Sequence, residues 1–118
     1  MAKQIIINRD DAICFEMARS SFRQCTYFGT HIEADLLIDK EGKRIYVTSV
    51  NECCELHLSL LGEFNRMNVL AAISALHALS FPLCILVPLT KSLQLPEGRM
   101  QQISQNGVTV VIDYAHTP

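Results

Sequence analysis

The sequence predicts an α/β fold, and three observations lead to that class. Residues 5–7 and 108–112 are short apolar runs rich in β-branched side chains, without polar alternation, as in strands that are buried on both faces. Residues 65–79 instead place apolar side chains at helical spacing. The block between the first run and this helix alternates apolar and polar positions and contains a hairpin turn. Strands and helices therefore share one short chain.

The first apolar run leads into a helix. Residues 8–11 follow it and supply both a turn and a helix N-cap, with acidic side chains near the positive end of the helix dipole. We expect this helix to span residues 12–19 and to turn Ile13, Met17 and Cys14 inward.

The middle of the chain is rich in β structure. We expect a strand at 25–29 and a hairpin whose strands, 35–39 and 43–48, flank a Lys-Glu-Gly turn. Residues 55–60 alternate strictly between leucine and polar side chains. This alternation predicts a half-buried antiparallel strand with its leucines on one face and a solvated His57 on the other.

Two helices follow the β-rich block. The stronger prediction is residues 65–79, where Leu70, Ile73 and Leu76 follow helical spacing and several alanines let another element approach closely. A second helix is expected at 83–93, with a proline at the position before it.

The end of the chain contains a linker and a hairpin. Residues 95–98 have the composition of a linker, and two strands at 99–104 and 108–112 come after it. The dipeptide Asn106-Gly107 between them is a strong signal for a tight hairpin turn.

Composition limits the classes of protein that the chain can belong to. A length of 118 residues allows at most one compact domain, or a piece of something larger. The chain is 49% apolar and 19% charged, which is ordinary for a folded cytoplasmic protein. A net charge of −2 without a basic cluster argues against nucleic acid as a partner. The longest apolar stretch, 81–89, contains two prolines and is too short to cross a membrane, and residues 5–7 are too few for a signal peptide.

Five cysteines raise the question of a metal or a disulfide framework. Their number is odd and none forms a Cys-x-x-Cys pair. We therefore expect buried, reduced thiols and no metal site.

The polar residues after the last strand are candidates for ligand binding. In an open α/β sheet, ligands collect beyond the carboxyl ends of the strands. Asp113 can accept two hydrogen bonds from a ribose diol, the ring of Tyr114 offers a stacking face, and His116 can donate or accept a hydrogen bond nearby. The alternative is that Asp113 only caps a turn.

Two amides and one guanidinium extend this set. Asn65 and Asn68 share a helix face, and a carboxamide can donate to and accept from adenine at once. The alternative is that Asn65 is an N-cap and Asn68 a spectator. Arg99 can reach phosphate oxygens with two parallel hydrogen bonds, or it is a surface arginine on an edge strand. One bound nucleotide would require Asp113 to share a cleft with Asn65 or Asn68.

Four motifs resemble those of the Mur ligase family, and among them the UDP-N-acetylmuramyl-tripeptide synthetases (MurE). Residues 8–11 resemble Asn-x-Asp-Asp, and residues 62–72 resemble Gly-x-Phe-Asn-x-x-Asn-x-Leu-Ala-Ala. Residues 98–101 resemble Gly-Arg-Met-Glu with glutamine in the last position, and residues 113–118 read Asp-Tyr-Ala-His-Thr-Pro. Sister families read differently after the same aspartate, so Thr117 is the residue that favours the tripeptide synthetases.

The resemblance implies a fold, an activity and a set of ligands. Residues 1–95 would be the last part of the central ATP-binding domain, and residues 96–118 a linker and the first strands of the C-terminal Rossmann-like domain. The parent enzyme would use ATP and Mg²⁺ to add a diamino acid, meso-diaminopimelate or L-lysine, to UDP-N-acetylmuramyl-L-alanyl-D-glutamate in peptidoglycan synthesis. Asn65 or Asn68 would contact adenine, and Arg99, Asp113 and the residues after it would face the nucleotide.

The chain alone is expected to be an inactive fragment. It has no Gly-x-x-x-x-Gly-Lys-[Ser/Thr] loop to cradle the β- and γ-phosphates, and it stops inside a motif. The alternatives are a non-catalytic nucleotide-binding module, an inert truncated remnant whose unpaired strand edges make it poorly soluble, or a fragment of a folylpolyglutamate-synthetase-like ligase.

Overall fold

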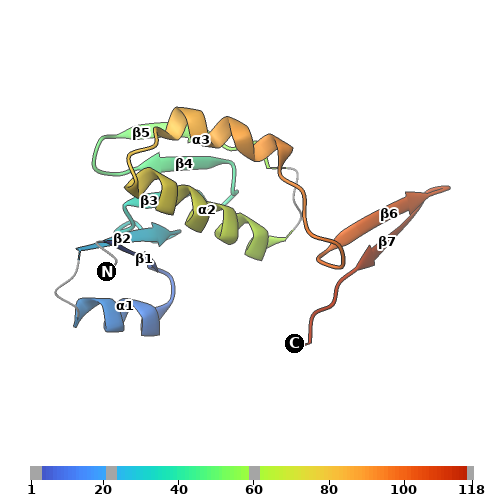
Figure 1. The fold of residues 1–118 in the computed structure, drawn as a ribbon, viewed down its shortest axis with the longest axis horizontal. Helices are drawn as coiled ribbons and strands as arrows, with labels where there is room; N and C mark the ends of the chain where they lie inside the picture. The colour runs from blue at the N-terminus through green and yellow to red at the C-terminus, as the bar shows by residue number, and fades with distance from the viewer. Residues whose placement is uncertain (1–3, 21–23, 59–61, 117–118) are drawn as a thin grey trace.

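Two separate sheets organise the chain (Figure 1). The structure is a computed structural model that describes residues 4–20, 24–58 and 62–116. A five-stranded sheet with three helices forms the main body, and a two-stranded hairpin stands away from it at the C-terminal end. The elongated outline, 54 × 32 × 28 Å along its principal axes, reflects this projection.

The main sheet has the order β1-β2-β3-β4-β5. Its strands are β1 (Gln4–Asn8), β2 (Gln24–Gly29), β3 (Leu36–Ile38), β4 (Arg44–Val47) and β5 (Glu52–Glu55). The pairs β1–β2 and β2–β3 are parallel, whereas β3–β4 and β4–β5 are antiparallel. The helices are α1 (Ala12–Arg19), α2 (Glu63–Ala78) and α3 (Leu83–Leu89), and a 3₁₀ turn, η1 (Thr90–Ser92), follows α3. The predicted α/β class is confirmed.

The hydrophobic core lies between the main sheet and helices α2 and α3. Helix α2 packs across β1, β2 and β3, and α3 packs on β5, so that both helices cover one face (Figure 1). Helix α1 contacts β1 from the other side of the sheet. The core side chains are Phe28, Leu36, Ile38, Ile45, Val47, Leu56, Val69, Leu70, Ile73, Leu83, Leu86 and Val87.

Both hairpin turns that the sequence predicted, at residues 40–42 and at Asn106-Gly107, are confirmed. The hairpin β3–β4 turns at residues 39–43, where the carboxylate of Asp39 accepts the Lys43 N–H at 2.7 Å. The second hairpin pairs β6 (Gln101–Gln105) with β7 (Val108–Ile112). Its turn holds Asn106 and Gly107 at φ of 50° and 77°, the positive values that a tight two-residue turn requires.

The bounds predicted for helix α1 are confirmed, but its predicted inward face is wrong. Asp11 is the N-cap and accepts the Cys14 N–H at 2.9 Å. Ile13 and Met17 are 74% and 70% exposed, whereas Ala18 is buried. A second apolar stripe of the helix, formed by Phe15 and Ala18, faces the sheet instead. The Phe15 ring packs edge-on against Tyr27 of β2. Short apolar spacing cannot choose between two such stripes.

The strand predicted at residues 55–60 lies earlier in the chain. Strand β5 ends at Glu55, paired with Arg44, and Leu56 N–H donates to the Lys43 carbonyl as the last rung. Pairing stops there because β4 begins at Arg44 and the turn precedes it. Leu56 still packs in the core, while residues 59 and 60 lie outside the described residues.

Burial of the outer strands differs from the prediction. Val108, Val110 and Val111 of β7 are 64%, 52% and 47% exposed, because among the described residues β7 has only β6 beside it and no helix covers the hairpin. Strand β1 is half-buried rather than buried, since it is the edge strand of the main sheet. Both departures have one cause: an apolar run predicts a strand, but it does not reveal how many layers cover that strand.

The two later helices also differ at their ends. Helix α2 begins two residues before the predicted start. Helix α3 is shorter than predicted, because it ends at Leu89 and continues as the tighter η1 turn. Pro88 lies inside α3 and lacks the N–H for an intrahelical hydrogen bond, which limits its regular length.

Candidate functional site: a cavity between two helices

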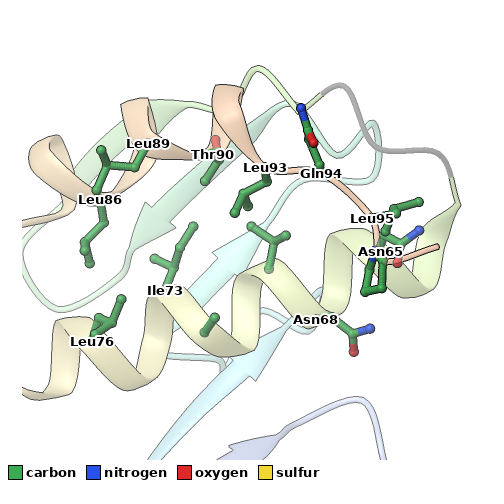
Figure 2. A pocket seen from close by; sticks show the side chains of 13 residues that line it. Asn65, Asn68, Ile73, Leu76, Leu86, Leu89, Thr90, Leu93, Gln94 and Leu95 are labelled. Carbon is green, nitrogen blue, oxygen red and sulfur yellow. The ribbon is translucent and has the colours of Figure 1, made fainter. Parts of the chain in front are cut away.

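A cavity of about 490 Å³ lies between α2 and the segment that runs from α3 through η1 to Pro96 (Figure 2). Such a volume is in the range of pockets that bind small molecules and cofactors. Its lining residues are Asn65, Asn68, Val69, Ala72, Ile73, Leu76, Leu86, Leu89, Thr90, Leu93, Gln94, Leu95 and Pro96.

The two predicted amides lie in the first half of α2 and line one end of the cavity. Figure 2 shows Asn65 beside Leu95 at this end and Asn68 one turn further along α2. Asn65 is half-buried and Asn68 is exposed. The alternative that Asn65 caps the helix is wrong, because Gly62 is the N-cap and Asn65 stands inside the first turn. Asn65 therefore lines the cavity from the first turn of α2, and Asn68 lines it from the next turn.

Apart from Thr90 and Gln94, the rest of the cavity wall is apolar. Val69 and Ile73 on α2 and Leu86 on α3 are buried, and Figure 2 shows Leu76 and Leu86 at the end away from Asn65. Thr90 is buried as well, and its hydroxyl donates to the Val87 carbonyl at 2.6 Å. Among the described residues that line the cavity, none has an ionisable side chain. The cavity thus suits a neutral group with hydrogen-bonding atoms at one end.

The remaining predicted site residues lie outside this cavity. Arg99, Asp113, Tyr114 and His116 are exposed, and none of them lines it. Asp113 follows β7, on the hairpin that stands apart from the main body (Figure 1). The structure therefore brings Asn65 and Asn68 to one cavity and leaves the other four residues elsewhere. The described residues thus do not form the cleft that Asp113 was expected to share with Asn65 or Asn68, and the contact of these residues with one nucleotide stays a prediction.

Tyr114 has a clear structural partner at the base of the hairpin. Its backbone N–H donates to the Gly98 carbonyl at 2.8 Å, and its ring lies against the Gly98 Cα, where a Cβ would overlap the ring. The Gln101 side chain accepts the Gly98 N–H at 3.2 Å. The glutamine that stands in place of the family's usual glutamate thus helps to fix the turn before β6.

A polar cluster at the carboxyl ends of β1 and β2 was not singled out from the sequence. The carboxylate of Asp10 accepts hydrogen bonds from the Thr30 N–H at 2.8 Å, the Thr30 hydroxyl at 3.0 Å and the His31 N–H at 3.1 Å. It packs so closely against Gly29 that a Cβ there would lie 2.7 Å from a carboxylate oxygen. The Asp-Asp pair after a strand was the available signal, and it indicated only caps and turns.

Arg9 belongs to the same end of the sheet. Its guanidinium donates to the carboxylate of Glu33 and lies 3.6 Å from the centre of the Phe15 ring. The hydrogen bond from Arg9, helped by its positive charge, lowers the pKa of Glu33 below its ordinary value. The contacts join α1, β1 and the loop after β2, which is a structural task.

The cysteines form neither a disulfide nor part of a metal site in the described residues. None of the five cysteines, all of which lie in the described residues, forms a disulfide. Cys14, Cys53 and Cys84 are exposed, so the expectation that they are buried is wrong for these three. Cys53 lies on the outward face of the edge strand β5. Within residues 4–20, 24–58 and 62–116, no group of three or more His, Cys, Asp or Glu side chains could hold a metal ion.

No helix in the described part of the chain is long and apolar enough to span a membrane.

The mixed sheet, with helices on both sides and an amide-lined cavity, defines part of an α/β domain. A family model described as the Mur ligase middle domain matches residues 2–76. The chain belongs to the Mur ligase family, as its motifs predicted.

Curated relatives and solved structures agree with this family. The chain is 36% identical over 121 residues to a UDP-N-acetylmuramoyl-L-alanyl-D-glutamate–2,6-diaminopimelate ligase of Pseudomonas syringae pv. tomato, covering 96% of this chain and 25% of the relative. It is 31% identical over 123 residues to a UDP-N-acetylmuramyl-tripeptide synthetase 2 of Oceanobacillus iheyensis, with coverages of 98% and 25%.

The fold of the whole chain, hairpin included, is found in larger solved proteins. A crystal structure of MurF from Acinetobacter baumannii matches with a TM-score of 0.81 at 18% identity, covering 100% of this chain and 27% of that one. A UDP-N-acetylmuramoyl-L-alanyl-D-glutamate–2,6-diaminopimelate ligase matches with a TM-score of 0.75 at 29% identity, covering 98% and 26%. The chain thus spans about a quarter of the length of these relatives. Thr117, on which the preference for the tripeptide synthetases depended, lies outside the described residues.

Proposed function

We propose that the chain is the part of an ATP-dependent amide ligase that holds the base of ATP, in an enzyme that extends the peptidoglycan precursor UDP-N-acetylmuramoyl-L-alanyl-D-glutamate by a diamino acid. Membership of the Mur ligase family and the names of the curated relatives support this proposal. Several of these names specify 2,6-diaminopimelate, which favours that amino acid over L-lysine.

The observation that carries the proposal is the pair of amides in the interhelical cavity. Asn65 and Asn68 bring the only carboxamides of α2 to one end of a cavity whose other lining side chains are uncharged and, apart from Thr90 and Gln94, apolar. An amide can accept a hydrogen bond from the adenine amino group and donate to the adjacent ring nitrogen, and apolar walls suit the faces of the base. The donor set therefore fits adenine, while the triphosphate has to lie outside.

The hairpin residues would complete the nucleotide site from the following domain. Asp113 would accept the ribose hydroxyls, Tyr114 and His116 would lie beside the sugar, and Arg99 would face the phosphates. We divide the chain at the linker accordingly, with residues 1–95 in the middle domain and residues 96–118 at the start of the next. The exposure of all four side chains leaves them available for such a contact.

In the whole enzyme, ATP supplies the driving force for amide formation. The substrate carboxylate attacks the γ-phosphorus, ADP leaves, and the diamino acid's amine then displaces phosphate from the acyl phosphate. Mg²⁺ would neutralise the phosphates during the first step. The residues of this chain hold the base and the sugar and do not perform the transfer, because its sequence has no phosphate-binding loop.

Calorimetric titration of the 118-residue chain with adenosine and with ATP tests the proposal. We expect saturable binding of both, weakened about tenfold in Asn65→Ala or Asn68→Ala, since each loses a base-specific hydrogen-bond pair. Gln102→Ala is the matched control, because Gln102 is an exposed amide on the hairpin. Equal affinities in all four proteins, or no binding to the wild type, would exclude adenine recognition by this cavity.

Turnover is tested separately. The chain alone should release no phosphate from ATP when UDP-N-acetylmuramoyl-L-alanyl-D-glutamate and 2,6-diaminopimelate are added together. Release that depends on both additions would show that the chain catalyses the reaction by itself, against the proposed division of labour.

A further inference from the structure

We propose that Tyr114 and Gln101 are positioning residues of the nucleotide site. They fix Gly98 at the base of the hairpin, and the fixed base holds Arg99 opposite Asp113. This inference rests on the proposed function, because it takes Arg99 and Asp113 as contacts of one nucleotide. It goes beyond that function by naming two residues that set the geometry of the site through their neighbours.

The base of the hairpin has the form of a β-bulge. The regular ladder of β6 and β7 ends with the pair Gln101–Ile112. The next contact is the 2.8 Å hydrogen bond from the Tyr114 N–H to the Gly98 carbonyl. Between these two contacts the first strand has two residues and the second strand has one. Such a two-against-one arrangement bends a strand and re-aims its side chains, and it is common beside active sites.

The bulge brings together the two charged side chains of the proposed site. Its two residues are Arg99 and Met100, and the single residue opposite them is Asp113. Arg99 and Asp113 are both exposed, and in the described part of the chain neither side chain has a hydrogen bond or an ion pair. A guanidinium and a carboxylate therefore remain free for one ligand that offers both an anion and a diol.

The backbone of the bulge is held in a strained conformation. Met100 has a φ of 46°, a left-handed value that residues with a Cβ rarely adopt. Strain of this kind persists only where the surrounding contacts over-determine the backbone, and it is concentrated at ligand sites. The contacts on either side of Met100 must therefore be strong enough to hold it.

Gly98 supplies those contacts on one side of the bulge. Its carbonyl accepts the Tyr114 N–H, and its own N–H donates to the Gln101 side-chain oxygen at 3.2 Å. It is buried, and the Tyr114 ring lies so close that a Cβ would overlap it. Its φ of 74° belongs to a turn that is closed by the hydrogen bond from the Arg99 N–H to the Pro96 carbonyl. Loss of either side chain would free this turn, and with it the backbone of Arg99.

A positioning role differs from direct stacking on the nucleotide in one measurable way. A ring that stacks costs affinity when it is removed, whatever stands at positions 99 and 113. A ring that acts through Arg99 and Asp113 costs affinity only while these side chains are present. In the double variant Arg99→Gln/Asp113→Asn, Tyr114→Leu should therefore have no further effect on the affinity for ATP.

Calorimetric titration of the 118-residue chain with ATP measures these affinities. We expect Tyr114→Leu and Gln101→Met each to weaken ATP binding about three- to tenfold, since each loses one contact with Gly98. Tyr114→Phe keeps the ring, and Gln101→Glu keeps an acceptor for the Gly98 N–H, so both should bind as the wild type does.

Two matched controls come from the same hairpin. Gln102→Met changes the next residue of β6, which is also a glutamine and is exposed, and Gly107→Ala changes the other glycine of the hairpin that has a positive φ. Both should leave the affinity for ATP unchanged. Amide chemical shifts of β6 and β7 check that every variant keeps the hairpin. Thermal unfolding should not change, because the hairpin contributes no residue to the core cluster.

The possible outcomes separate this inference from the proposed function. ATP binding that depends on the two charged side chains but is unchanged by Tyr114→Leu and Gln101→Met overturns the positioning role alone. So does a loss from Tyr114→Leu that persists in the double variant Arg99→Gln/Asp113→Asn, because the ring would then contact the nucleotide itself. ATP binding that is weakened by the hairpin variants but not by Asn65→Ala supports the positioning role and overturns the base contact. Failure of the wild type to bind ATP overturns both.

Discussion

At the scale of single residues, Asp10 is the side chain that joins the ends of the first two strands. Its carboxylate receives three hydrogen bonds from Thr30 and His31, whose chain positions are about twenty residues away. We predict that Asp10→Ala lowers the free energy of unfolding by about 1–3 kcal/mol, because it removes the hydrogen bonds to an ionised carboxylate that join the ends of β1 and β2. Urea denaturation measures this change. Glu41→Ala is the control, since the Glu41–Lys43 ion pair is exposed and its loss should change stability by less than about 1 kcal/mol.

Asp11 makes a pH-dependent contribution at the start of α1. The Cys14 N–H, donated to the Asp11 carboxylate, lowers the pKa of Asp11 below its ordinary value of 3.8. A lowered folded-state pKa stabilises the protein above the unfolded-state pKa and stops doing so as the pH falls through the folded-state value. We predict that wild type exceeds Asp11→Asn in stability above pH 3.8 and that the difference shrinks below it. Urea denaturation at a series of pH values measures the difference, and a constant gap would contradict the prediction.

The residues show which contacts a sequence reveals. Asp11 acts within its own turn, so a local rule predicted its role. Asn65 and Asn68 are three positions apart on one helix, so their spacing predicted that they share a helix face. The partners of Asp10 lie just after the end of β2, and the Glu33 partner of Arg9 lies in the same loop. No pattern within a short window contains such pairs, which is why the cluster was missed.

At the scale of elements, Gly98 and Gly107 offer a matched test of the hairpin's base and tip. Both have positive φ, 74° and 77°, but a Cβ at Gly98 would overlap the Tyr114 ring, whereas a Cβ at Gly107 would meet nothing within 4 Å. We predict that Gly98→Ala displaces Tyr114 while Gly107→Ala leaves it in place. Both substitutions introduce backbone strain of about 1 kcal/mol, but only the first also places a Cβ against the Tyr114 ring. The ring-current shift of the residue 98 Hα in NMR spectra reports the position of the ring. Loss of that shift in both variants would contradict the prediction.

The elements themselves were predictable to different degrees. The bounds of α1 and the turns of both hairpins followed from caps and from glycine, which act within a few residues. The inward face of α1 did not, because Ile13 with Met17 and Phe15 with Ala18 form two rival apolar stripes on one short helix. Only the position of Tyr27 on β2 favours the second stripe, and that position is a property of the tertiary structure.

At the scale of the whole molecule, the chain divides into a packed body and an uncovered hairpin. All residues of the core cluster fall between Phe28 and Val87, so β6 and β7 contribute nothing to it. Strand β7 was predicted to be buried because its β-branched run is typical of a central strand, yet no layer covers it. The run is consistent with a strand that is covered in a longer protein, as expected for a chain that spans a quarter of its relatives.

Removal of the hairpin tests this division. A chain ending at Glu97 keeps the core cluster and every residue that lines the interhelical cavity. We predict that its free energy of unfolding stays within about 0.5 kcal/mol of the full chain, because most of the lost residues are exposed and none belongs to the core cluster. We also predict that it associates less, since β6 and β7 expose Ile103, Val108 and Val110 beside unpaired strand edges. Urea denaturation and light scattering measure the two effects.

In the full-length chain, Val110→Lys should reduce association to the same extent by placing a charge on the edge strand. A truncated chain that unfolds more easily by several kcal/mol, or that aggregates as readily as the full chain, would show that the hairpin is part of the body.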